Sequence, residues 1–384
     1  MTGGGSGGHL IPIASLGHAL KQKKPACRLI YIGLKGGPLD KRLADNPDFS
    51  ETYFVSSGKF RRYHGQSWLR SLLDAPSWLL NIRDFFRVIK GTFSAWRLLR
   101  RLKPNLVFSK GGYVVVPVGV AARLLKIPIM THDSDAVPGL ANRIVGRWAR
   151  VNTTGLASGL YAYPKHKIRH VGIPTDRRVQ SVTPDLQTEF KKELGLEPLS
   201  QLLLAVGGGL GSKTINELVA AIAPQLLADN PKLLIIQIVG PKHEADMKAI
   251  RSRLTPQLQA RLTTLAFSDQ FYKYSAAADL IIARAGASTL AEFALQAKAC
   301  IIIPAAFLAG GHQLQNANEL AKRRAIKLLR EPLTAEQLQA TVQTLLDDAS
   351  QRANLAANLA ATAIPDSAAK LAELLLAEAG DGAG

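Results

Sequence analysis

The segment LLLAVGGGLGSKTINEL, residues 202–218, decides the fold, because it leads from a strand to a helix through a glycine-rich turn. Its first five residues are continuously apolar, which is typical of a strand covered by helices on both faces of a parallel sheet. The glycines that follow let backbone N–H groups approach an anion at the start of the next helix. Ser212 replaces a glycine that a P-loop ATPase requires before Lys213. We therefore interpret the loop as a diphosphate-binding turn, with an ordinary strand-to-helix turn as the alternative.

The first glycine-rich turn of the chain, GGGSGG at residues 3–8, precedes another helical pattern. It fits the dinucleotide pattern G-x-G-x-x-G by count, but five glycines in six residues match many patterns. No strand-end acid follows about 20 residues later, so we predict no dinucleotide cofactor. The alternative to an anion-binding turn is a plain tight turn. Because a doubly wound domain needs a strand ahead of this turn, we expect the native start to lie upstream of Met1, with the first strand missing.

The remainder of the chain repeats the strand and helix alternation. With 384 residues it exceeds a single core, so we expect two domains. Proline and glycine place the hinge near 163–184. The predicted fold class is α/β, with two Rossmann-like, doubly wound parallel-sheet domains facing a central cleft. The expected domains are 1–168, 169–364 and a C-terminal helix and tail, 365–384, packing on the first. Further strands are expected at 28–32, 106–108, 127–131, 233–239, 280–283 and 300–303.

Positive charge is concentrated in one part of the chain. The formal net charge is +19, and residues 59–103 carry eleven Lys or Arg against two Asp. This segment interleaves aromatic residues with the basic ones, as does a helix lying on an anionic membrane surface. Nucleic acid could also stack on such aromatics, but it would not explain two glycine turns. We therefore expect membrane contact through Trp68, Trp78, Phe85, Phe86 and Trp96 and no nucleic-acid partner.

The remaining composition points to a reducing compartment. The two cysteines, Cys27 and Cys300, have neither disulfide nor metal spacing. We see no signal peptide and no apolar run long enough to span a bilayer.

Three polar positions stand where chemistry is expected. His9 follows the first glycine turn and is a candidate general base, because neutral imidazole titrates near physiological pH. Residues 132–135, HDSD, end a predicted strand, where active sites of open α/β sheets lie. Residues 284–292, RAGASTLAE, enter a helix that Ser288 or Thr289 can cap, and whose Glu292 can accept hydrogen bonds from ribose. The alternatives are a surface histidine, a helix cap at 134–135 and an acid complementing the helix dipole.

Taken in order, these motifs resemble the MurG family, glycosyltransferase family 28. Beside the two turns and the segments above, the resemblance rests on KGGY at 110–113, VGIP at 171–174 and HQLQNA at 312–317, and it covers nearly the whole chain. It implies a GT-B fold and transfer of N-acetylglucosamine from UDP-GlcNAc to lipid I, giving lipid II for peptidoglycan. It implies no metal or cofactor, an undecaprenyl-linked acceptor, and peripheral attachment to the anionic cytoplasmic face of the inner membrane.

The resemblance also implies roles for individual residues. His9 and Asp133 are the catalytic candidates, either of which could remove the acceptor proton, and Arg177 is the candidate for the family's arginine contact. Asp135 stands where the family has a donor-binding asparagine. The implied donor- and phosphate-binding residues are Ser6, Gly7, Gly8, Asp135, Gly208, Gly209, Gly211, Phe267, Ser268, Ala287, Ser288, Thr289, Leu290, Glu292 and Gln313.

Two other enzyme classes fit parts of the pattern. A UDP-GlcNAc 2-epimerase shares a two-lobed fold of this kind but has no use for the basic aromatic segment. A family 28 transferase acting on diacylglycerol would keep that segment and make a glycolipid.

Overall fold

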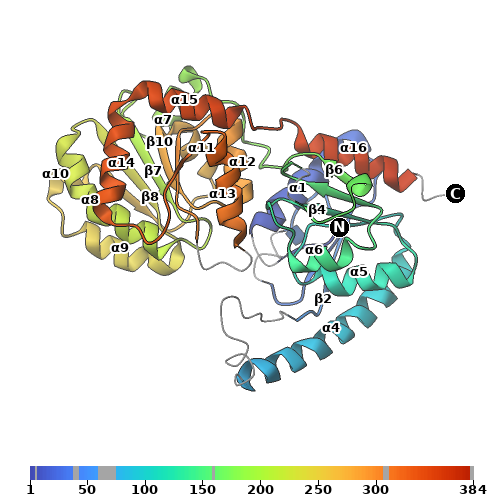
Figure 1. The fold of residues 1–384 in the computed structure, drawn as a ribbon. Helices are drawn as coiled ribbons and strands as arrows, with labels where there is room; N and C mark the ends of the chain where they lie inside the picture. The colour runs from blue at the N-terminus through green and yellow to red at the C-terminus, as the bar shows by residue number, and fades with distance from the viewer. Residues whose placement is uncertain (5–6, 38–42, 59–74, 158–160, 306–310, 381–384) are drawn as a thin grey trace. The chain divides into compact units, whose positions relative to one another are not determined.

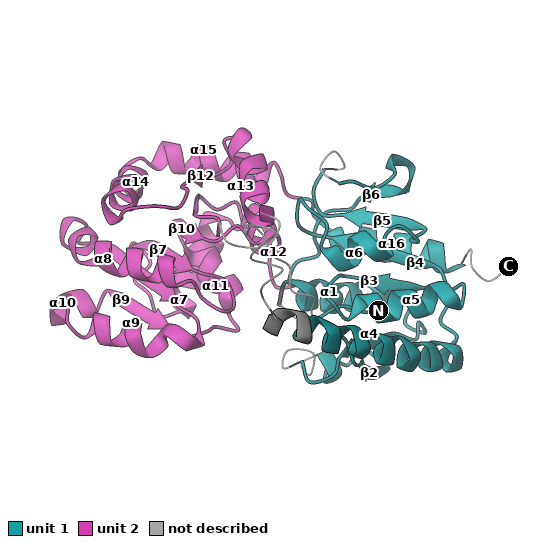
Figure 2. Cartoon of the chain, turned by 60° about the horizontal axis from the view of Figure 1, so that its bottom comes forward, with its two compact units in different colours: residues 1–176, 364–384 teal, residues 177–363 magenta. Residues whose placement is uncertain are grey.

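The computed structural model places two compact units of similar size (Figures 1 and 2). It describes residues 1–4, 7–37, 43–58, 75–157, 161–305 and 311–380. Unit 1 contains Met1–Asp176 and Ile364–Gly384, and unit 2 contains Arg177–Ala363. The chain therefore leaves unit 1, completes unit 2 and returns to unit 1 with its last helix. Among the described residues, no helix is both long and apolar enough to cross a membrane.

Unit 1 is built around parallel strands. Its two sheets have the orders β1-β2 and β3-β4-β5-β6. Its described strands are β1 (Ile30–Leu34), β2 (Glu51–Val55), β3 (Val107–Ser109), β4 (Ile129–Asp133), β5 (Val151–Thr154) and β6 (Ile168–His170). Its described helices are α1 (Gly7–Lys23), α4 (Ala75–Leu102), α5 (Val115–Leu124), α6 (Leu140–Val145), the 3-10 turn η2 (Lys165–Lys167) and α16 (Ser367–Gly380).

Residues 1 and 2 lie between these two sheets. Thr2 forms parallel bridges with Ile32 on one side and Ser109 on the other. Its N–H donates to Phe108 O, and its carbonyl accepts from Lys110 N. Sequence analysis assigned no strand ahead of the first glycine turn, whereas these two residues pair in the central position. With residues 1 and 2 included, the strand order becomes β2-β1-(residues 1–2)-β3-β4-β5-β6. This is a doubly wound order, and its topological switch point lies between Thr2 and β3.

Unit 2 has one six-stranded parallel sheet of order β12-β11-β10-β7-β8-β9. Counted within the unit this is the 3-2-1-4-5-6 order, whose switch point lies between β7 and β10. Its described strands are β7 (Gln201–Val206), β8 (Leu233–Ile238), β9 (Leu262–Leu265), β10 (Leu280–Ala283), β11 (Cys300–Ile302) and β12 (Lys327–Leu328). Its described helices are α7 (Pro184–Glu193), α8 (Lys213–Asp229), the 3-10 turn η3 (Pro241–His243), α9 (Glu244–Arg251), α10 (Pro256–Gln259), α11 (Phe271–Ala277), α12 (Ala287–Leu295), α13 (His312–Lys322), α14 (Ala335–Asp347) and α15 (Ala349–Ala360).

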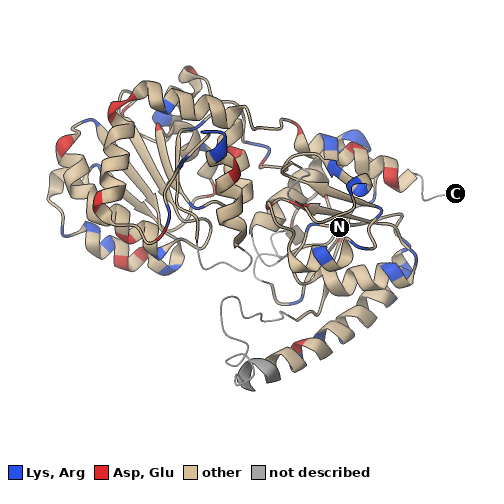
Figure 3. Ribbon diagram, in the orientation of Figure 1, with Lys and Arg blue, Asp and Glu red and all other residues tan. Residues whose placement is uncertain are grey.

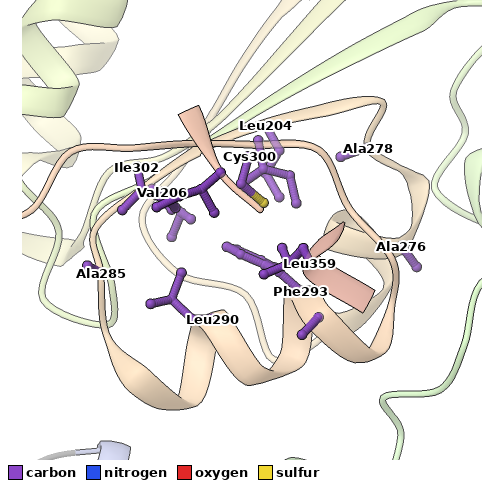
Figure 4. Close-up of a cluster of buried hydrophobic side chains, with 14 of the residues drawn as sticks. Leu204, Val206, Ala276, Ala278, Ala285, Leu290, Phe293, Cys300, Ile302 and Leu359 are labelled. Atoms are coloured by element: carbon purple, nitrogen blue, oxygen red, sulfur yellow. The ribbon is translucent and has the colours of Figure 1, made fainter. Parts of the chain in front are cut away.

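Apolar side chains cover both faces of the unit 2 sheet. On one face, Phe293 and Leu290 of α12 lie among strand residues such as Leu204 and Cys300 (Figure 4). On the other face, α8 and α14 pack on alternate residues of the same strands, Leu203 among them. This two-sided burial explains why the strands of this unit are continuous apolar runs.

The C-terminal helix α16 belongs to the core of unit 1. It packs against α1, and Leu371, Ala372 and Leu375 lie in one buried cluster with Leu16 and Leu20. Lys23 Nζ also pairs with Glu373 Oε1 at 2.6 Å. The helix thus covers one face of the sheet beside α1.

Candidate functional site

Two glycine turns meet at the switch point of unit 1. Gly111 and Gly112 follow β3 with φ values of +105° and +87°, which other residues rarely adopt. A Cβ at Gly112 would lie 2.3 Å from Gly4 O. A Cβ at Gly3 would lie 3.0 Å from Lys110 Cβ. The turns therefore touch through their backbones, and only glycine permits this approach.

His9 lies in the first turn of α1, directly above these glycines. Its Nδ1 donates to Gly4 O at 2.8 Å, which fixes the neutral tautomer with the lone pair on Nε2. That Nε2 lies 3.5 Å from the point that a Gly111 Cβ would occupy. Burial, and secondarily the Lys110 cation, lower the pKa of His9 to about 4. The ring is therefore neutral at physiological pH and carries a lone pair on Nε2, although the lowered pKa makes it a weaker base than an exposed imidazole.

Asp133, at the end of β4, is a buried carboxylate with both oxygens hydrogen-bonded. Its Oδ1 accepts from Asn142 Nδ2 at 3.0 Å, and its Oδ2 accepts from the Tyr163 hydroxyl at 2.8 Å. Ser109 Oγ donates to Asn142 Oδ1 at 2.7 Å and so fixes the orientation of that amide. Burial raises the pKa of Asp133 to about 6, against the lowering effect of these hydrogen bonds. Asp133 is consequently poised to change charge slightly below neutral pH.

Asn142 donates to Asp133 and lies near the same glycine as His9. Its Nδ2 lies 3.7 Å from the same point beside Gly111 from which His9 Nε2 is 3.5 Å away. His9 and the Asn142–Asp133 pair therefore border the same small space at the edge of the sheet, as predicted for the carboxyl ends of neighbouring strands. Neither Asn142 nor Tyr163 had been singled out from the sequence.

Lys110 places a buried positive charge beside these groups. Burial lowers the pKa of Lys110, while the charges of Asp133 and Asp135 raise it. Asp135 itself is half-buried. The helix that follows begins at Leu140 with Gly139 as its N-cap, so residues 134 and 135 do not cap it. The HDSD segment therefore ends β4 and does not cap α6.

The second glycine turn occupies the switch point of unit 2. It joins β7 to α8, and Gly208 and Gly211 have φ values of +84° and +79°. A Cβ at Gly211 would lie 1.9 Å from Val239 O, so the turn packs directly on the end of β8. Gly209 has open space where a Cβ would stand. The turn is thus held from behind by backbone contacts.

Arg284 ties this turn to two further segments. Its Nε donates to Ser212 Oγ at 3.0 Å, and Ser212 Oγ in turn caps α8 by accepting from Ile215 N at 3.4 Å. The Nη1 atom of Arg284 donates to Ile303 O at 3.0 Å and to Glu331 Oε1 at 2.8 Å. This buried network, which sequence reasoning did not find, fixes the start of α8 relative to β10 and β11.

The neighbouring helix α12 begins at Ala287 with Gly286 as its N-cap and no side-chain cap. The prediction that Ser288 or Thr289 caps it is therefore wrong, because both already lie within the first turn. Ala287, Leu290 and Glu292 are buried in this helix. The start of α12 thus has no side-chain cap.

Several other residues predicted to bind the donor also lie in unit 2, whereas Gly7, Gly8 and Asp135 lie in unit 1. Gln313, in α13, accepts from Ala305 N through its Oε1 at 3.0 Å. Phe267 and Ser268 follow β9, and Phe267 is half exposed. Exposed Arg177 is the first residue of the unit, and its neighbour Arg178 stacks 4.6 Å over the Tyr272 ring.

A few predicted residues lie outside the described residues or at their edges. Ser6 and Trp68 lie outside the described residues. Gly7 and Gly8 form the start of α1. Trp78 lies in α4, without a described side chain.

The described part of the basic aromatic segment is α4, which spans 28 residues, about 42 Å of helix. One face packs against α5 through residues such as Ala95 and Leu99. An apolar stripe on α4, in which every side chain is at least half exposed, consists of Ile82, Phe85, Phe86, Ile89 and Phe93. Their spacing places them on one side of the helix.

Basic residues border this apolar stripe. The helix carries six Lys or Arg and one acid, Asp84. Trp96 is half-buried and stacks on Phe93, with centroids 6.1 Å apart. Lys and Arg also occur elsewhere in the described chain, as on α5 and α6 (Figure 3).

The chain matches known families along most of its length. The glycosyltransferase family 28 N-terminal domain matches residues 1–152, and the family's C-terminal domain matches residues 202–371. A Carboxydothermus hydrogenoformans protein is 30% identical over 93% of this chain and 91% of its own. Its name is UDP-N-acetylglucosamine--N-acetylmuramyl-(pentapeptide) pyrophosphoryl-undecaprenol N-acetylglucosamine transferase. A Bacillus thuringiensis protein of that name, numbered 2, is 29% identical over 98% of this chain and 97% of its own.

Solved structures show the same architecture. The crystal structure of Acinetobacter baumannii MurG has a TM-score of 0.72 at 26% identity and covers 98% of both chains. The S. aureus MnaA–UDP structure has a TM-score of 0.65 over 96% of this chain and 92% of its own, but at 11% identity it shows the fold alone. Together with the two parallel-sheet units, these similarities establish that the chain belongs to glycosyltransferase family 28.

Proposed function

We propose that this chain transfers N-acetylglucosamine from UDP-N-acetylglucosamine to N-acetylmuramyl-(pentapeptide) pyrophosphoryl-undecaprenol, which is the lipid I to lipid II step. The observation that carries the proposal is the similarity, over nearly the whole chain, to relatives named for this reaction. The anion-binding turns at both switch points are the parts that such a reaction needs, since donor and acceptor each carry a diphosphate.

Unit 2 is the proposed donor-binding unit. The diphosphate of UDP would lie against the turn at Gly208, Gly209 and Gly211 and the start of α12, where helix N-termini favour negative charge. Arg284 supports this turn from behind through Ser212. The remaining donor contacts predicted from the resemblance, Glu292 on the ribose and Gln313 on the sugar, are retained in the proposal.

Unit 1 is the proposed acceptor-binding unit, with His9 as the base. His9 Nε2 would take the proton of the acceptor hydroxyl while the hydroxyl oxygen bonds to the anomeric carbon of the donor sugar. The bond from that carbon to the UDP oxygen breaks, and UDP leaves with the electron pair, giving inversion. We prefer His9 to Asp133 because both Asp133 oxygens are already engaged by Asn142 and Tyr163. Asp133 would supply negative charge and orient Asn142 toward the acceptor.

We propose that transfer requires no metal ion or cofactor, with helix N-termini and basic side chains stabilising the leaving UDP. No cluster of three or more potential metal-ligating His, Cys, Asp or Glu side chains occurs in the described ranges. Chelation with EDTA tests this proposal, and lost activity that Mg²⁺ or Mn²⁺ restores would contradict it.

The apolar stripe on α4 is the proposed contact with the anionic inner face of the cell membrane. Its aromatic residues would reach the headgroup boundary, and each bordering Lys or Arg would contribute about 1 kcal/mol near an anionic surface. This peripheral location brings the enzyme to a lipid-linked acceptor.

Ligand-dependent thermal unfolding tests the donor assignment. UDP and UDP-N-acetylglucosamine should raise the Tm according to mass action, and UDP-glucose should raise it less. Equal shifts for both sugar nucleotides would contradict the specificity for N-acetylglucosamine. Conversion of UDP-N-acetylglucosamine to its 2-epimer without any lipid would identify an epimerase instead.

A further inference from the structure

Tyr163 belongs to no motif that suggested function, yet it contacts the buried carboxylate of the unit 1 site. It lies in the segment between β5 and β6, 30 residues after Asp133, and its hydroxyl donates to Asp133 Oδ2 at 2.8 Å. Phenylalanine would fill the same space but could not make this bond. The hydroxyl therefore has a task beyond packing.

The surrounding structure holds the Tyr163 ring in place. The ring stacks on Tyr161 with centroids 6.5 Å apart and planes 5° from parallel. On the side toward α6, a Cβ at Gly146 would lie 2.8 Å from Tyr163 Cε1. Stacking on one side and a glycine on the other leave the hydroxyl aimed at the carboxylate.

We propose that Tyr163 is a positioning residue for the transfer reaction, which together with Asn142 holds Asp133 as an oriented, ionised carboxylate in the acceptor site. This inference rests on the proposed function for the role of the site, but the contact itself does not. A hydrogen bond from a phenol favours the charged carboxylate, because an ionised oxygen is a stronger acceptor than an oxygen of the protonated acid.

The proposal predicts a pH dependence with a definite sign. Burial raises the pKa of Asp133 to about 6, and the Tyr163 and Asn142 hydrogen bonds lower it. Without the Tyr163 hydroxyl the pKa should rise further, so Asp133 should take up its proton at higher pH. Other titratable or charged groups facing this region are His9 on α1, Lys110 after β3, Asp135 after β4, Arg143 on α6 and Tyr161.

His9 does not mask this effect. Its pKa of about 4 lies well below that of Asp133. Loss of activity near pH 6 would therefore report on Asp133, and loss near pH 4 on His9.

The test compares the full-length wild type with Tyr163→Phe and Tyr161→Phe. Tyr161 is the matched control, because its hydroxyl faces the Asp133 backbone carbonyl at 3.4 Å and not the carboxylate. Infrared titration of the carboxylate band, assigned with Asp133→Asn, measures protonation without substrate. Transfer rates from pH 5 to 9 measure its consequence.

For Tyr163→Phe, we expect the midpoints of the infrared titration and of the pH–rate profile to move up by about one pH unit. This is the size expected for a hydrogen bond to a charged group. Activity at pH 6 relative to pH 8 should then fall from about one half to about one tenth. Incorporating 3,5-difluorotyrosine at position 163, a stronger donor of nearly the same shape, should move the midpoints down. This variant keeps the test informative if the phenylalanine variant folds poorly.

The outcomes separate the two proposals. An infrared midpoint unchanged in Tyr163→Phe, or moved equally by Tyr161→Phe, would overturn the role of Tyr163. If the infrared midpoint shifts in Tyr163→Phe but the wild-type protein transfers no sugar to lipid, the Tyr163–Asp133 link stands and the proposed function is rejected.

Discussion

The Nδ1 atom of His9 donates a hydrogen bond to the carbonyl oxygen of Gly4 across 2.8 Å. A backbone carbonyl can only accept, so this contact determines which ring nitrogen carries the proton. The lone pair of the neutral ring then lies on Nε2, beside Gly111 and Asn142. The Gly4 carbonyl therefore fixes the tautomer of His9, the proposed base.

Replacing His9 with alanine should lower the transfer rate by about 10²–10⁴-fold, the range for loss of a general base. UDP affinity should remain nearly unchanged, because the proposed UDP site lies entirely in unit 2. Steady-state kinetics and calorimetric titration with UDP measure the two quantities. Full activity in His9→Ala would eliminate the histidine as base.

Replacing Gly112 with alanine should separate the two glycine turns of unit 1. The new Cβ would lie 2.3 Å from Gly4 O at a φ of +87°, so the turn holding His9 must move. We expect the free energy of unfolding to fall by about 2 kcal/mol or more and transfer to be nearly lost. Gly139→Ala is the matched control, since open space surrounds its Cβ position at a φ of −61°. Comparable losses in both variants would argue against the close approach.

Replacing Arg284 with alanine should weaken UDP binding and destabilise unit 2. Its removal leaves Glu331 and the Ser212 cap without their shared partner, and breaking a buried pair costs about 3–5 kcal/mol. Lys191→Met is the control, because Lys191 pairs with Asp279 at 2.9 Å at the opposite end of β10. It should lower the Tm while preserving the UDP affinity of the folded protein. An unchanged UDP affinity in Arg284→Ala would show that the network does not support the turn.

Replacing Phe86 with glutamate should reduce sedimentation with vesicles containing anionic lipid. The change removes an exposed aromatic from the apolar stripe on α4 and adds a charge repelled by the surface. Leu199→Glu makes the same change in charge at an exposed leucine of unit 2 and should sediment like the wild type. Equal sedimentation of both variants would exclude α4 as the membrane contact.

Much of the sheet in unit 2 could be predicted because its strands are apolar on both faces. The runs expected at 202–206, 233–239, 280–283 and 300–303 correspond to β7, β8, β10 and β11 to within a residue at each end. Strand β5 of unit 1 was missed because its sequence, VNTT, is mostly polar. Its polar side chains are nonetheless buried and hydrogen-bonded, in part to β4, as when Thr131 Oγ1 donates to Asn152 Oδ1 at 2.6 Å. Hydropathy carries no signal for such a strand.

The site was predictable only where its residues adjoin a recognisable motif. His9 follows a glycine turn and Asp133 ends an apolar strand, so both could be selected from local sequence. Asn142 and Tyr163 reach Asp133 from 9 and 30 residues further along the chain, and neither lies in a pattern of its own. The Arg284–Glu331 contact spans 47 residues for the same reason. Such partners are set by the tertiary fold, which local spacing does not contain.

The most direct test of the proposed function is transfer of labelled sugar to lipid by the purified full-length chain. The protein would be incubated with UDP-[¹⁴C]N-acetylglucosamine and N-acetylmuramyl-(pentapeptide) pyrophosphoryl-undecaprenol in anionic vesicles, and label would be counted in the extracted lipid. We predict one N-acetylglucosamine added per acceptor lipid, with His9→Ala nearly inactive. Label that remains wholly in the water phase, with the protein folded and UDP bound, would contradict the account.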